Sequence, residues 1–309
     1  MGFTTRPELK GTFGMVSSTH WLAAQCGMAV LEHGGNAFDA AVAAGFVLQV
    51  VEPHLNGLGG EVPIVLWDVA RARPEVICGQ GPVPRSASID SIRALGLEDV
   101  PGTGLLAACV PGAFGGWMTL LRDHGTWRLG DVMRFAIEYA EAGYPLAPRT
   151  AGAIAMVEGL FREQWPTSAA VYLRDGLPTA GSRFRNPDLA ATYRRLVGEG
   201  ESAGGGRERE IDAAFSAFYS GWVAEAIERH CREEFMDSSG IAHRGLLSGS
   251  DLAAFKAGTR SRSPSISTVG RWLNAGRGAR DRCSCSSCGC SMASTSTAPG
   301  FWAPTTSIS

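Results

Sequence analysis

The histidines and one glycine-rich loop are the first candidates for chemistry, and their spacing favours structural roles. His20, His33, His54 and His124 lie far apart, without the H-x-x-x-H spacing that places two imidazoles on one helix face. The loop NGLGG, residues 56–60, lacks the lysine and the helix context of a phosphate-binding loop. We therefore predict neither a histidine metal site nor a nucleotide site here, and no cofactor.

A cysteine cluster near the end of the chain offers four thiolates within eight residues: Cys283, Cys285, Cys288 and Cys290. Zinc sites of structural type bring together two ligand pairs that a folded loop separates, so this cramped spacing suits them poorly. We predict that the segment binds no metal tightly. The alternative is a non-catalytic remnant whose cysteine tail holds a metal.

Four further cysteines are scattered through apolar surroundings and are predicted to be buried thiols of a reducing compartment: Cys26, Cys78, Cys109 and Cys231. The first residues, with Arg6 and Glu8, lack the apolar stretch of a secretory signal. The longest apolar run, residues 40–51, is far shorter than the roughly 20 residues that cross a bilayer. We expect a cytoplasmic protein with no membrane span.

The composition of the 309 residues, 45% hydrophobic and 19% charged, is that of a globular protein with a sizeable core. A formal net charge of -2 gives no field that would attract nucleic acid or an anionic membrane. We predict neither as a partner.

Helices and a few strands must position any site in the chain. Gly, Pro and capping residues mark the ends of these elements. Ser18 or Thr19 is expected to cap a first helix, and Asn36 to cap a second, apolar on nearly every face. Strands are predicted over residues 62–68, 75–78 and 105–110. Further helices are predicted over 89–95, 112–122, 129–142, 147–161, 187–197 and 218–230, with a mobile loop over 198–209.

A run of motifs in this frame resembles the gamma-glutamyltranspeptidase family. The family's large subunits carry G-G-N-A-x-D-A-A-V-A, then V-E-P-H, then G-x-G-G, and here these stand at residues 34–43, 51–54 and 57–60. Later stretches keep the family's order, namely VPGAFGGW, NPDLAATYRRL, FYSGWVAEAI and SGSDLAAF. The resemblance covers residues 11–257, and this region resembles part of the family's large subunit.

The resemblance implies a layered α/β fold, the N-terminal nucleophile hydrolase αββα sandwich. It implies a precursor that cleaves itself, after which the new N-terminal threonine of the small subunit transfers an acyl group from gamma-glutamyl amides such as glutathione to water or an amino acid. The matched residues do not include that threonine, so no catalytic residue is assigned. The expectation is a truncated, inactive chain, with an incomplete sandwich whose helix at residues 40–51 is partly uncovered.

Gln80 and Arg85 are the predicted substrate-binding residues. In members that cleave glutathione, an R-E-x-A-P segment supplies an arginine for the substrate's α-carboxylate, and this chain reads GQGPVPRSA there. Gln80 takes the arginine's position and Gly81 the glutamate's, while Arg85 lies close enough in sequence to substitute. A neutral amide grips a carboxylate less well than a guanidinium. The alternative is therefore a related amide hydrolase or acylase with a non-glutamyl acyl group.

A change of composition divides the chain into a family-like region, residues 1–257, and a tail, residues 258–309, rich in Ser, Arg and Cys. Such a tail buries too little to fold, and we expect it to be disordered. If the tail is written in GC-rich codons and translated in a reading frame shifted by one base, it can encode sequences that resemble the family's continuation after Ala257. We interpret the tail as the product of a frameshift.

Overall fold

A three-stranded antiparallel sheet forms one face of the molecule. The computed structural model describes residues 9–261, 265–267 and 270–272. Strand β1 (Val62–Asp68) pairs with β2 (Arg73–Gly79), and β2 pairs in turn with β7 (Gly258–Ser261). The predicted strands over residues 62–68 and 75–78 are confirmed.

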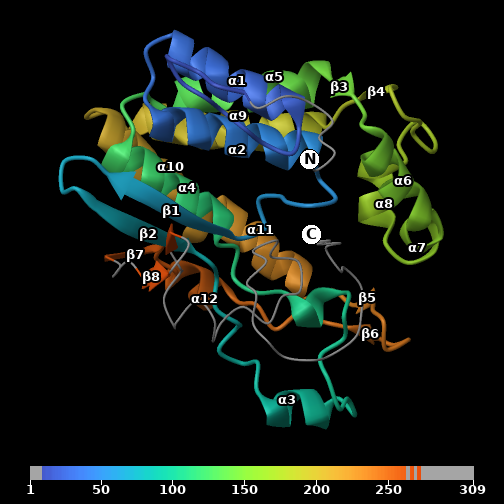
Figure 1. The fold of residues 1–309 in the computed structure, drawn as a ribbon. Helices are drawn as coiled ribbons and strands as arrows, with labels where there is room; N and C mark the ends of the chain where they lie inside the picture. Colours follow the sequence, from blue (N-terminus) through green and yellow to red (C-terminus); the bar gives the residue numbers. More distant parts are fainter. Residues whose placement is uncertain (1–8, 262–264, 268–269, 273–309) are drawn as a thin grey trace.

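The helices stack on one side of this sheet (Figure 1). Helix α4 (Ala113–His124) packs on β1 and β2, α2 (Ala37–Val51) packs on α4, and α1 (Trp21–Glu32) and α5 (Leu129–Ala142) pack on α2. Helices α9 (Pro187–Ala203) and α10 (Arg207–Tyr219) close the layer between α5 and α4. Helices and one sheet thus form a layered α/β body.

The remaining elements are short. Helices α6 (Pro148–Met156), α7 (Glu158–Glu163) and α8 (Pro166–Tyr172) form a small lobe to one side (Figure 1). The others are α3 (Ile89–Ala94), the 3-10 turn Leu105–Ala107, α11 (Trp222–Cys231) and α12 (Gly249–Ala253). Three two-residue or three-residue ladders complete the described residues: β3 (Tyr144–Pro145) with β4 (Arg183–Phe184), β5 (Phe235–Met236) with β6 (Ala242–His243), and β8 (Ser265–Ser267) with β9 (Gly270–Trp272).

Helix α2 is the centre of the core. Its side chains from Ala40 to Val51 are almost all buried among α1, α4, α5 and α9. Gly45 lets α4 approach closely, because a Cβ there would lie 2.4 Å from the Trp117 ring. The expectation that this helix is partly uncovered is therefore wrong, since helices of this same chain cover it.

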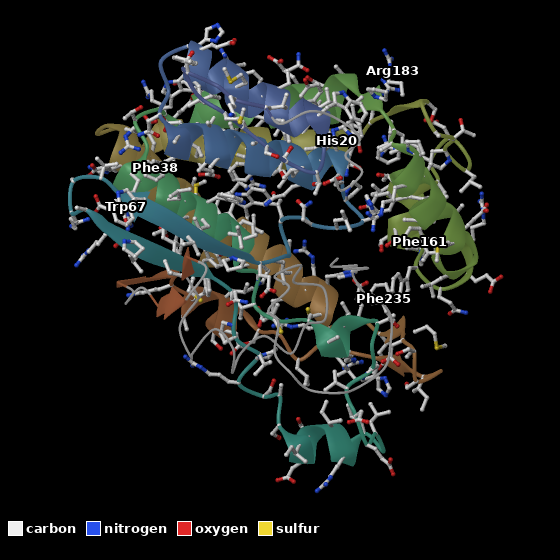
Figure 2. The ribbon with its side chains drawn as sticks, viewed as in Figure 1. His20, Phe38, Trp67, Phe161, Arg183 and Phe235 are labelled. Carbon is white, nitrogen blue, oxygen red and sulfur yellow. The ribbon has the colours of Figure 1, made fainter. Side chains whose placement is uncertain are left out.

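The far face of the sheet is exposed at β1 and covered at β2, where Val76 is only 5% exposed. The register pairs Val65 with Val76 and Trp67 with Pro74, so these residues share the face opposite α4. Val65 is 45% exposed and Trp67 50% exposed. Figure 2 shows Trp67 near the end of β1.

Strand β7 begins directly after residue 257, where the composition of the chain changes. Residues 258–261 pair with Cys78–Glu75 of β2, so the expected disorder from residue 258 is wrong for this segment. Ladder hydrogen bonds come from the backbone, and a polar sequence can supply them. The cysteine cluster at residues 283–290 lies outside the described residues.

Several predicted elements differ from the structure. His20, rather than Ser18 or Thr19, caps α1, and a 3-10 turn replaces the strand expected over 105–110. The helix expected over 147–161 breaks at Val157. The loop expected over 198–209 shrinks to residues 204–206, since α9 continues to Ala203 and α10 begins at Arg207.

Candidate functional site

Three segments converge at the N-terminus of α4. The backbone oxygen of Gly60 accepts hydrogen bonds from Gly112 N and Ala113 N, both at 2.9 Å. Val110 N donates to Pro82 O at 3.0 Å. The G-x-G-G loop, the residues after β2 and the V-P-G turn are therefore held together by their backbones.

Gln80 lies within this convergence, directly after β2. It is 7% exposed, and its Nε2 donates to Glu61 Oε2 at 3.2 Å. The Cys78 thiol lies 3.9 Å from Gln80 Oε1 and donates to it weakly. Glu61 is the partner that sequence reasoning missed, although its place directly after the glycine loop could have pointed to it.

Close packing against Val110 requires glycine at position 81. A Cβ at Gly81 would lie 1.5 Å from Val110 O, so no side chain, including the glutamate of the family's pattern, fits this backbone. Gly112 is equally tight, with its Cβ position 2.3 Å from Gly79 O. The two backbone segments therefore lie too close together for a side chain at residue 81.

Arg85 lies farther along, in an exposed turn. Its backbone N donates to Asp251 Oδ1 at 3.1 Å, which ties the turn to the start of α12. Burial of Asp251 opposes its ionisation, but hydrogen bonds from Ser248 and Arg85 hold its pKa below the usual value. Gln80 and Arg85 thus have different partners, and the structure gives them no contact with each other.

His20 and His54 flank the buried carboxylate of Glu52 at the ends of α1 and α2. Thr19 Oγ1 donates to Glu52, and Thr150 Oγ1 lies 3.3 Å from His54 Nδ1. Burial lowers the pKa of both imidazoles, against the opposing charge of Glu52. Figure 2 shows His20 at the end of α1 that faces the α6–α8 lobe. Among the described residues, the buried Nε2 atoms of His20 and His54 have no hydrogen-bond partner.

We expect the free energy of unfolding to fall as pH falls below about 6.5, the ordinary histidine value. His20 Nδ1 accepts from Leu22 N at 3.2 Å, and a protonated ring could not accept. Because its folded pKa is lowered, the unfolded chain binds protons first, and each such proton costs about 1.4 kcal/mol per pH unit. Urea unfolding between pH 8 and 5 measures the slope. His20→Asn keeps a cap acceptor that does not titrate and should flatten the slope; an unchanged slope would contradict this assignment.

The other candidate ligands do not gather into a site. His124 Nε2 lies 3.5 Å from Glu75 Oε2, and His33 Nδ1 caps its own helix at Ala29 O. Among the residues that the structure describes, no group of three or more His, Cys, Asp or Glu could hold a metal ion, and no helix is long and apolar enough to cross a membrane. Cys26 and Cys231 are buried as predicted, whereas Cys78 is half-buried and Cys109 is exposed, which corrects the prediction for Cys109.

A cavity of about 210 Å³ opens on the other side of the glycine loop. Gly57 and Leu58 form one wall. The stacked rings of Tyr172 and Phe184, with centroids 6.1 Å apart, form another. Its polar lining consists of carboxamides, from Gln49, Asn56 and Asn186. Glu61, Gln80 and Arg85 are not among the residues that line this cavity.

The described residues form helices packed on one face of a sheet, as in the layered N-terminal nucleophile hydrolase fold. The family model for gamma-glutamyltranspeptidase matches residues 23–270, past the boundary at residue 257. The chain belongs to the gamma-glutamyltranspeptidase family.

Individual relatives agree with this assignment. The chain is 33% identical over 241 residues to the glutathione hydrolase-like YwrD proenzyme of Bacillus subtilis, covering 76% of this chain and 42% of the relative. It is 34% identical over 255 residues to the oxamate amidohydrolase proenzyme of Klebsiella pneumoniae, covering 80% and 43%. The solved structure of LmbA2991HD superposes with a TM-score of 0.83 at 51% identity, covering 86% and 46%. The chain thus spans less than half the length of these relatives.

Proposed function

We propose that this chain is the large-subunit portion of an amide-cleaving acyltransferase or hydrolase, and that the nucleophilic threonine belongs to a small subunit of the same precursor. The observation that carries this proposal is the convergence of the Gly57–Gly60 loop, Gln80 and Val110–Ala113 at the start of α4. These segments carry the family's motifs, and their backbones form one rigid unit. The chain would bind and orient the acyl donor.

The reaction is acyl transfer from an amide. The threonine hydroxyl attacks the amide carbonyl, and the α-amine of the same threonine takes the proton. The α-amine then passes this proton to the leaving amine, which departs as the acyl–enzyme forms. Water or an amino acid then takes the acyl group. Gamma-glutamyl amides such as glutathione are the first substrate candidates, because the glutathione hydrolase-like protein is among the relatives. The reaction needs no metal or organic cofactor.

The small subunit is the partner that the open sheet face fits. Val65 and Trp67, at 45% and 50% exposure, leave apolar area in water on this face. Covering each 100 Å² of such area gains about 2.5 kcal/mol, from which the entropic and ordering costs of association are subtracted. Without the threonine of the small subunit, we expect no activity from this chain alone. A cytoplasmic location and a frameshift after Ala257 remain parts of this proposal.

A second candidate is an amide hydrolase or acylase that takes a non-glutamyl acyl group. The neutral, buried amide of Gln80 favours it, because a carboxylate-bearing donor would lose the charged, bidentate partner that arginine supplies. The relative described as an oxamate amidohydrolase acts on a donor of another kind. If neither donor class is cleaved, the chain is interpreted as a non-catalytic remnant.

The test begins with sequencing the gene across the Ala257 codon and restoring the family's reading frame where a shift is found. The restored precursor should process itself and cleave 4-nitroanilides of one donor class, measured by the release of 4-nitroaniline. The 309-residue chain should release none. Cleavage by that chain would contradict the missing-nucleophile proposal. An in-frame read confirmed by independent clones would contradict the frameshift.

A further inference from the structure

The cavity beside the glycine loop has a neutral lining, because every described residue that lines it is uncharged. Its volume is about 210 Å³. An apolar cavity of roughly 150 Å³ already admits benzene, so this one has room for a six-membered ring that bears one polar group. Tyr172 and Phe184 stack along one side, with ring planes 11° apart. A flat, neutral molecule suits this space.

Gln49 contributes a buried amide NH₂ group to the cavity. The Tyr193 hydroxyl donates to Gln49 Oε1 at 2.8 Å. The reversed amide would leave the hydroxyl proton of Tyr193, which is 0% exposed, without an acceptor, so Nε2 lies at the other end. Gln49 is 4% exposed, and within the described residues its Nε2 has no hydrogen-bond partner, although the atom is not fully enclosed. This donor is therefore free where Gln49 lines the cavity.

Two asparagines of the lining have orientations fixed by the backbone. Asn186 Oδ1 accepts from Leu189 N at 3.1 Å as the cap of α9, so its NH₂ group is the end left for a ligand. Asn56 Nδ2 donates to Glu52 O at 3.4 Å, which leaves its Oδ1 as an acceptor. With Gln49, the cavity offers two NH₂ donors and one carbonyl acceptor.

We propose that this cavity binds a neutral primary carboxamide carried on a flat ring. The carbonyl oxygen of such a ligand has two lone pairs, which accept from Gln49 and Asn186, and its NH₂ group donates to Asn56. A carboxylate would bring an unpaired charge into a lining without a cation and would face the Asn56 oxygen. An ammonium would meet the two NH₂ donors. The inference goes beyond the proposed acyl transfer and does not need its threonine, since the lining residues belong to this chain.

Three probes that share one ring test the site on the 309-residue chain: benzamide, benzoate and acetophenone, in which O⁻ or CH₃ replaces the NH₂ group. Titrations followed by saturation-transfer NMR should show benzamide binding about tenfold more tightly than either of the others, the value of one net hydrogen bond. Asn186→Asp keeps the cap acceptor of α9 but replaces the NH₂ donor by a charged acceptor. Benzamide should bind to this variant about tenfold more weakly.

Ala191→Asp is the matched control, because it adds the same charge at an exposed position of α9 that does not line the cavity. It should keep the parent's affinity for benzamide. A second variant combines Gln49→Leu with Tyr193→Phe, which removes the cavity donor without leaving a buried partner unsatisfied, and it should also weaken benzamide about tenfold. Circular dichroism melts identify the folded variants.

The carboxamide site is overturned if benzoate or acetophenone binds as tightly as benzamide, or if the folded variants bind benzamide as the parent does. It is also overturned if benzamide does not bind to the folded parent chain. Each of these results leaves the proposed acyl transfer standing, because that proposal is tested by the release of 4-nitroaniline from the restored precursor.

Discussion

Replacing Asp39 by asparagine is expected to lower the free energy of unfolding by about 3–5 kcal/mol. The Asp39 side chain is fully buried. Its Oδ1 accepts from Thr126 N at 2.8 Å and Trp127 N at 3.1 Å, and its Oδ2 from Asn36 N at 2.9 Å and Thr126 Oγ1 at 2.7 Å. An asparagine NH₂ would point a donor at Thr126 N and Trp127 N or, turned the other way, at Asn36 N, where only the Thr126 hydroxyl could turn to accept. The start of α2 would then lose its attachment to the turn before α5.

Urea unfolding followed by circular dichroism measures the change in unfolding free energy. Asp188→Asn is the control: Asp188 also lies in the first turn of a helix, but its side chain is 73% exposed and pairs with Arg174 at the surface. It should cost less than about 1 kcal/mol. A similar small loss for Asp39→Asn would show that the buried carboxylate does not hold the two segments together.

Replacing Gly81 by alanine should cost about 4 kcal/mol or more, or prevent folding. The new Cβ would lie 1.5 Å from Val110 O, so the two backbone segments must move apart. That movement would also carry Gln80 away from Glu61 and disturb the candidate donor site. Chemical denaturation measures the loss in stability.

Gly198→Ala serves as the opposite case. Gly198 lies within α9 and a Cβ there would meet nothing within 4 Å, so alanine should stabilise the chain by about 1 kcal/mol through helix propensity. If Gly81→Ala proved as harmless as Gly198→Ala, the close approach of residues 79–82 and 110–112 would be wrong.

The sequence alone determined the family and many of the elements near the candidate site. The motif GGNAFDAAVA predicted the cap of α2, and the structure confirms Asn36 and Asp39 as a capping box. Strand β1 and helix α5 have the predicted bounds, because short apolar runs between glycines and periodic apolar positions are local signals. Gln80 was singled out by its place in a family motif, and its role stays a prediction.

Only the tertiary structure decided what depends on contacts between distant segments. Gly198 and Gly200 predict a loop, yet both lie in α9. A Cβ at Gly200 would lie 2.7 Å from Glu210 O, so glycine at this position lets α10 pack closely against α9. Glu61 and Gln80 are nineteen residues apart, and strand pairing brings them into contact. The Asp39 carboxylate likewise finds Thr126 and Trp127 far along the chain. Local patterns reveal caps and periods, whereas a partner across the fold is chosen by the packing of the whole chain.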